Sequence, residues 1–187
     1  MPGGAAFASA GFAWGCFNAS LVTIIAFGPG LLIARAIPLA DAGFVVSLAI
    51  WVTIVSIPLG GMLGDRLGRP TLLIVLGSVV AAATTLLLPV WPHTALGFVL
   101  VGLAVGGPPG PLMALLPRAL PAERLTATFG VFYTVYYVVM ALTQPAAGLV
   151  RDRAADPAAP IVFAAAVMAA TVLGLGLFRG AERAAAR

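Results

Sequence analysis

The sequence predicts an all-α membrane protein, because its composition is too apolar for water and its apolar residues fall into six long runs. Of its 187 residues, 61% are hydrophobic and only 9% are charged, and the mean hydropathy is +1.10. Soluble domains carry about 25% charged residues. Crossing about 30 Å of hydrocarbon takes roughly 20 apolar residues in a helix. The six runs reach that length and lie at residues 11–34, 43–63, 71–90, 94–116, 127–150 and 159–178.

The runs predict helices rather than the strands of a barrel. A backbone that faces lipid must satisfy its own hydrogen bonds, and the runs lack the apolar–polar alternation of barrel strands. Several contain prolines, at Pro29, Pro58 and Pro145, and the fourth run contains a Gly/Pro cluster at 106–111 that predicts a bend. The whole chain, 1–187, is therefore predicted to form a single transmembrane domain with six crossings.

Composition argues against several other classes of protein. The net charge of +4 could suggest nucleic acid, but there is no lysine and the arginines lie between apolar runs. A lone cysteine, Cys16, and a lone histidine, His93, give no disulfide and no metal cluster. All six carboxylates fall outside the predicted spans, so no intramembrane acid is available as a proton relay. We predict no catalytic residue, no metal and no cofactor.

The arginines predict the orientation of the chain in the membrane. No basic residue precedes Arg35, so the first run is interpreted as a retained helix rather than a signal peptide. If both termini are cytoplasmic, seven arginines lie inside and three outside, in agreement with the positive-inside rule. The prediction is a multi-pass protein of the cell (inner) membrane with both termini in the cytoplasm.

The second and third runs are joined by a short charged stretch, residues 60–70. Two apolar helices that meet at so short a link must be antiparallel. Asp65, Arg66 and Arg69 place the link outside hydrocarbon, where a central charge costs roughly 2.5–3.5 kcal/mol. The glycines of the stretch are expected to supply tight turns, because glycine adopts positive φ freely.

A sequence repeat relates the second run to the fifth. Residues 58–66 and 145–153 both read P-x-x-G-x-[L/V]-x-D-R, at an offset of 87 residues, and Gly43 pairs with Gly130 at the same offset. Three helices separate the copies, which is an odd number, so they must face opposite sides of the bilayer. This is the pattern of an inverted-topology repeat, a common arrangement in secondary transporters.

The charged stretch resembles the loop signature G-x-L-x-D-R-x-G-R of the major facilitator superfamily, although Pro70 stands where a second basic residue is common. The resemblance implies six helices in two inverted triplets, which is one half of that fold, with the flavour of a C-terminal half of a cyanate-type small-anion permease. It also implies a solute transporter working by alternating access, in which the loop aspartate latches onto the opposite half. The implied gating residues are Gly61, Asp65, Arg66, Gly68 and Arg69. The alternative role for these residues is only to anchor the loop and set its topology.

Polar side chains within the spans are the candidates for solute binding. Asn18 lies in the first span, where the resemblance implies a cavity-lining helix; the alternative is an interhelical hydrogen bond, worth about 0.6 kcal/mol on average. Residues 133, 137, 140 and 144 share one face of the fifth helix. Tyr133, Tyr137 and Gln144 could bind a small polar solute from that face, or the aromatic rings could simply pack.

The expected partners are the lipid bilayer, a small-molecule solute, and a second six-helix half or a homodimer partner, with no nucleic acid. A second hypothesis remains open. The chain could be a truncated or orphan half-transporter that inserts without transport activity and acts only as a scaffold in the membrane.

Overall fold

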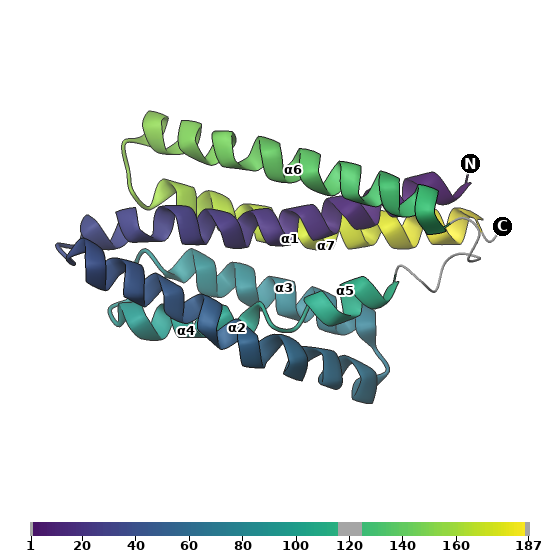
Figure 1. Cartoon of the computed structure of the whole chain (residues 1–187), viewed down its shortest axis with the longest axis horizontal. Coiled ribbons are helices and arrows are strands. Elements are labelled where there is room, and N and C mark those ends of the chain that lie inside the picture. The colour runs from purple at the N-terminus through teal and green to yellow at the C-terminus, as the bar shows by residue number, and fades with distance from the viewer. Residues whose placement is uncertain (1, 116–124, 186–187) are drawn as a thin grey trace.

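The computed structural model describes residues 2–115 and 125–185, and all the regular elements in these ranges are helices that run along one long axis (Figure 1). The N- and C-termini lie at the same end of the bundle (Figure 1). In chain order the helices are α1 (Pro2–Ile33), α2 (Leu39–Leu67), α3 (Pro70–Leu87), α4 (Thr94–Ala104), α5 (Pro109–Leu115), α6 (Leu125–Ala154) and α7 (Ala159–Ala185).

The predicted all-helical membrane class is confirmed. Within the described residues, five segments are long and apolar enough to cross a bilayer: α1, α2, α3, α7, and α4 with α5 taken together as Thr94–Ala114. Helix α6 has 30 residues and extends between the same two ends of the bundle (Figure 1). It is less apolar than the others because three tyrosines and Gln144 interrupt its hydrophobic residues.

The predicted link at 60–70 is much shorter than expected. Helix α2 continues through Leu67, so most of the charged stretch forms its last two turns. Gly68, with φ of 59°, ends the helix, and its N–H donates to the carbonyl of Gly64 at 3.2 Å. Helix α3 then starts at Pro70, a residue that is well suited to a first helical position because it has no N–H to satisfy. The positive φ expected of the glycines is found at Gly68.

Other boundaries also differ from the predictions. Helix α1 starts at Pro2 instead of residue 11, α6 continues to Ala154 instead of 150, and α7 reaches Ala185 instead of 178. The predictions followed hydropathy, whereas a helix continues into the interface as long as its backbone hydrogen bonds are satisfied. The bend expected in the fourth span is present: α4 ends at Ala104 and α5 begins at Pro109. The prolines at 108 and 109 cannot donate the backbone hydrogen bonds that would continue α4.

The two triplets are α1–α3 and α4–α7, with α4 and α5 forming one broken span. The first helix of each triplet packs against the other triplet. Helix α1 packs mainly against α7 and α6, whereas α4 packs against α2 and α3, and α3 lies against α7 between the two groups. This exchange is reciprocal: the first helix of each triplet packs on the second and third helices of the other. The arrangement agrees with the inverted repeat predicted from the sequence.

The ends of α2 and α6 repeat the same geometry at opposite ends of the bundle (Figure 1). Ala155, which is 87 residues after Gly68, also has a left-handed backbone, with φ of 50°. Its N–H donates to the carbonyl of Arg151 at 3.0 Å, and Arg151 is 87 residues after Gly64. Both helices therefore end in the same left-handed cap, two residues after the arginine of an Asp-Arg pair.

Small residues bring the backbones of α2 and α4 into direct contact. A Cβ atom on Gly60 would lie 2.1 Å from the carbonyl oxygen of Gly106, and one on Gly102 would lie 2.5 Å from that of Ala49. The hydroxyl of Ser56 donates to the carbonyl of Gly102 at 2.7 Å. Gly102, Gly106 and Gly110 recur every four residues, and small residues at this spacing let membrane helices approach each other.

Substituting Gly60 with alanine should destabilise the protein, because the new methyl group would clash with the backbone at Gly106. Overpacking of this kind typically costs about 1–3 kcal/mol. Gly61→Ala is the matched control, because a Cβ there meets nothing within 4 Å. Thermal unfolding of both purified variants in detergent tests the contact. Equal melting temperatures for the two variants would contradict it.

Candidate functional site

The predicted gating residues lie at one end of the bundle, in the last turns of α2 and the α2–α3 link. Gly64 is buried against the ring of Pro111, where a Cβ atom would come within 3.0 Å. This contact places the end of α2 beside α5. Between the two helices is a cavity of about 320 Å³, lined by Gly61, Gly64, Asp65, Gly68, Pro70, Gly110, Pro111 and Ala114.

The charged members of this group point outward. Asp65, Arg66 and Arg69 are all exposed, and in the described part of the chain none of them forms an ion pair. The carboxylate of Asp65 lies at the negative end of the α2 dipole, an unfavourable place for an anion. Within the described residues, neither Arg66 nor Arg69 forms an ion pair with Asp65.

Asn18 is partly buried on α1, and its amide Nδ2 donates to the carbonyl of Trp14 at 2.9 Å, one turn earlier on the same helix. The hydrogen bond is therefore within one helix. The alternative role, an amide bonded between helices, is not the arrangement found. A role for Asn18 in binding a solute stays a prediction.

The tyrosines of α6 form a row of contacting rings. Tyr133 and Tyr137 are stacked with centroids 6.3 Å apart, and Tyr136 meets Tyr137 edge-on at 4.7 Å. The packing expected of aromatic residues at this spacing is thus present. Two of these residues are nevertheless open to the surroundings, since Tyr133 is 44% exposed and Tyr137 is 63% exposed. A purely structural cluster would be expected to bury these rings.

Gln144 connects α6 to α1. Its Nε2 donates to the carbonyl of Ala19 at 3.3 Å and to the hydroxyl of Thr23 at 3.2 Å. Asn18 immediately precedes Ala19, so the two amide side chains lie at neighbouring levels of the α1–α6 contact. Of the predicted binding residues, Gln144 is therefore the one that joins two helices.

Helical geometry places these residues on one side of the α1–α6 pair. On α1, Ser20 faces α7, because its hydroxyl donates to the carbonyl of Ala164 at 2.7 Å. Asn18, two residues away, is about 160° around the helix from Ser20. On α6, Val139 lines a cavity together with α7 residues, and Tyr137 is likewise about 160° away from it. We call this set the polar wall; it lies away from α7 and comprises Asn18, Tyr133, Tyr137 and Gln144.

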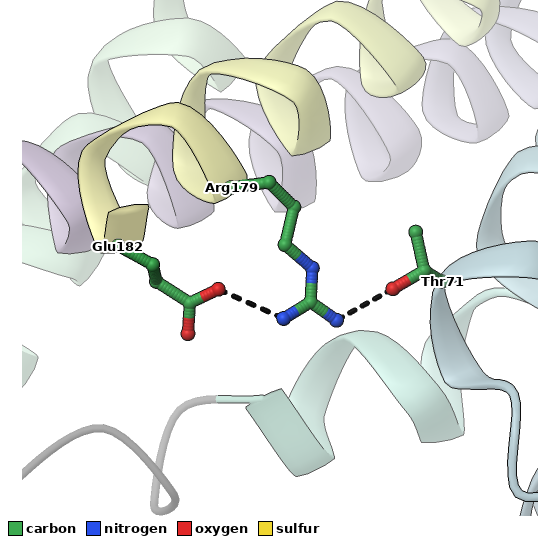
Figure 2. A network of polar contacts seen from close by, with 3 residues as sticks. All are labelled: Thr71, Arg179 and Glu182. Atoms are coloured by element: carbon green, nitrogen blue, oxygen red, sulfur yellow. Dashed lines mark hydrogen bonds and ion pairs between the residues drawn. The ribbon is translucent and has the colours of Figure 1, made fainter. Parts of the chain in front are cut away.

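Two arginines that tie helices together were not predicted as site residues. At the end opposite the termini, the Arg35 guanidinium donates to the carbonyls of Leu88, Pro89 and Trp91, after the end of α3. At the other end, Arg179 of α7 donates to Thr71 of α3 at 2.5 Å and to Glu182 at 2.8 Å (Figure 2). Except for Glu182, their partners are 53 to 108 residues away in the sequence, so no local pattern could identify them.

The remaining polar chemistry is sparse. Asp41, Asp65, Asp152 and Glu182 lie in helix ends rather than in the loops or tail where they were expected, and Asp156 lies between α6 and α7. Glu123 lies outside the described residues. In the ranges 2–115 and 125–185, no three His, Cys, Asp or Glu residues come together in a way that could hold a metal ion.

Membrane-length helices in two oppositely directed, interlocked triplets, with polar side chains along one side, define a membrane transport protein. The comparison with protein families narrows this class. The model of the major facilitator superfamily matches residues 4–187, and the chain belongs to this superfamily of secondary transporters. No curated protein and no solved structure matches the chain.

Replacing Gln144 with leucine should weaken the α1–α6 contact by about 0.6 kcal/mol, the average for a polar interaction between membrane helices. Combining Gln144→Leu with Thr23→Val should cost less than the sum of the two single changes, because they share one hydrogen bond. Tyr137→Phe is the control, since this ring is mostly exposed. Full additivity in unfolding measurements in detergent would contradict the contact.

Proposed function

We propose that the chain is one six-helix half of an alternating-access transporter, and that the polar wall binds a small polar solute, with small anions as the first class to test. The supporting observation is the exposure of the tyrosines in an otherwise apolar bundle. Tyr137 is 63% exposed on the side of α6 turned away from α7. Hydroxyl and amide groups in that position can donate hydrogen bonds to an anion at the depth of the membrane.

The end of α2 is the proposed gate. Asp65 is exposed at the mouth of the cavity between α2 and α5 and has no ionic partner among the described residues. A carboxylate at a helix C-terminus is stabilised by the positive N-terminus of another helix. A second helical unit could supply that N-terminus, so that the latch forms in one state of the transport cycle and breaks in the other.

The second unit would cover α2 and α6, either as a separate six-helix half or as a second copy of the chain. Both helices expose large apolar side chains: Ile54 is 71% exposed on α2, and Leu142 is 67% exposed on α6. Lipid can cover such side chains, but α6 also carries tyrosines and Gln144 of the polar wall, and polar groups facing hydrocarbon are costly. A partner that encloses a solute path removes this cost.

Both termini and the α2–α3 link lie at one end of the bundle, for which we propose the cytoplasmic side (Figure 1). Within the described residues, Arg66, Arg69, Arg179 and Arg183 are at this end, and Arg35, Arg151 and Arg153 are at the other. Arg118, Arg124 and Arg187, which the sequence assigns to the inner side, lie outside the described residues.

A cysteine introduced by Arg66→Cys should therefore resist an impermeant maleimide on intact cells and react once the membrane is broken. Arg153→Cys, at the opposite end, should react with intact cells and serves as the matched control. Both side chains are exposed, so accessibility depends on the side of the membrane. The reverse labelling pattern would overturn the proposed orientation.

Asp65→Asn should abolish uptake of labelled small anions, cyanate first, into liposomes that contain the purified protein, while membrane insertion stays normal. The change removes the charge that the proposed latch requires. Asp152→Asn is the control, because Asp152 is the counterpart of Asp65 in the repeat and lies near the C-terminal end of α6. It tests for the effect of losing a carboxylate at a helix end. Unchanged uptake by the Asp65→Asn protein would remove the gate from the proposal.

The alternative is that the chain inserts as an inactive scaffold. The presence of six predicted spans in a superfamily whose full members have twelve favours this hypothesis, unless a second unit is present. Native mass spectrometry of the reconstituted protein separates the two. A dimer or a complex with another six-helix chain, together with uptake, supports transport; a monomer that moves no solute supports the scaffold.

A further inference from the structure

A second cavity lies at the same end of the bundle, on the other side of the α2–α3 link, between α3 and α7. Its volume is about 570 Å³, and it is lined by Gly68, Arg69, Pro70, Thr71, Leu72, Val75 and Arg179. Two arginines, one hydroxyl and two apolar side chains thus share one hollow. The polar wall contributes no residue to it.

The cavity carries excess positive charge. Arg179 is held in place by Thr71 and Glu182, as Figure 2 shows, and Glu182 offsets part of its charge at 2.8 Å. Arg69 is exposed and forms no ion pair within the described ranges. Two guanidinium groups therefore line the cavity, and only that of Arg179 is paired with a carboxylate. The carboxylate of Asp65 lines the neighbouring cavity beside α5 rather than this one.

The start of α3 adds to this potential. Helix α3 has 18 residues and begins at Pro70, so its first turn lies along the cavity. Backbone N–H groups in a first helical turn have no partner within the helix, and the helix dipole makes that end positive. A phosphate group placed between Arg69 and Arg179 would face both guanidinium groups and these N–H groups.

The other side of the cavity is apolar and continues toward the middle of the membrane. Leu72 and Val75 form its wall. Further along the same face of α3, Val79 is 50% exposed and Leu86 is 51% exposed. A small soluble anion would leave the apolar surface uncovered. A lipid with an acidic headgroup and acyl chains can contact both the basic end and the apolar wall.

We propose that this cavity binds the headgroup of an anionic phospholipid, with the phosphate between Arg69 and Arg179 and an acyl chain along the exposed apolar face of α3. The site does not depend on the transport activity. It requires only that this end of the bundle lies at a membrane interface, where each basic residue strengthens binding to acidic lipid.

The test uses the full-length protein in detergent, with phosphatidylglycerol or phosphatidylcholine added, and native mass spectrometry to count retained lipids. Arg69→Gln should lower retention of phosphatidylglycerol about fivefold, the loss expected for one basic residue. Arg69→Lys should keep most of the binding, because it retains the charge. Arg153→Gln removes an exposed arginine at the opposite end and should change nothing.

Equal losses in Arg69→Gln and Arg153→Gln, or equal retention of phosphatidylcholine and phosphatidylglycerol, would overturn the proposal. Displacement of the lipid by millimolar inorganic phosphate would also overturn it and assign the cavity to a free anion. Arg179→Gln also removes a contact between α3 and α7. A loss of lipid from Arg179→Gln therefore supports the phosphate position only if this variant melts at the same temperature as Arg69→Gln. At equal melting temperatures, undiminished lipid retention by Arg179→Gln contradicts that position.

Discussion

The contact between the backbones of α2 and the broken fourth span is the constraint on which much of the structure depends. In lipid, apolar side chains gain little by leaving one hydrocarbon environment for another, so helices associate through close packing and hydrogen bonds. Gly60 and Gly106 allow that approach, and the Ser56 hydroxyl strengthens it by bonding to the carbonyl of Gly102. Gly64 lies one turn after Gly60 and continues this line of small residues. It lets the charged end of α2 pack against Pro111.

The exchange of first helices between the triplets makes the fold depend on contacts between its two halves. Helix α1 has its neighbours in α6 and α7, and the Ser20 hydroxyl bonds to the carbonyl of Ala164, 144 residues later in the chain. Helix α3 is held against α7 by Arg179 at one end of the bundle and is linked to the end of α1 by Arg35 at the other. Each first helix is therefore buried mainly by the other triplet.

The proposed gate and the polar wall differ in the kind of polar group they carry. The proposed gate carries full charges and lies at a helix end, where water can solvate them. The polar wall carries neutral hydroxyl and amide groups along the helices, where a full charge would be costly. The bend between α4 and α5 lies beside the gate, because the Gly/Pro segment packs against α2. A change in that packing is a direct way to move the end of α2 and with it Asp65.

The membrane class, the bend in the fourth span and the repeat could be predicted from the sequence alone, because each follows from hydropathy, proline chemistry or a fixed offset. Helix ends were poorly predicted, since hydropathy falls at the interface while helical hydrogen bonding continues, as at Leu67 and Ala185. The hydrogen-bond partners of the polar side chains become visible only in the folded structure. Asn18 bonds within its own helix, Gln144 reaches Thr23, and Arg179 meets Thr71. These contacts depend on which faces of distant helices meet, and local sequence does not contain that information.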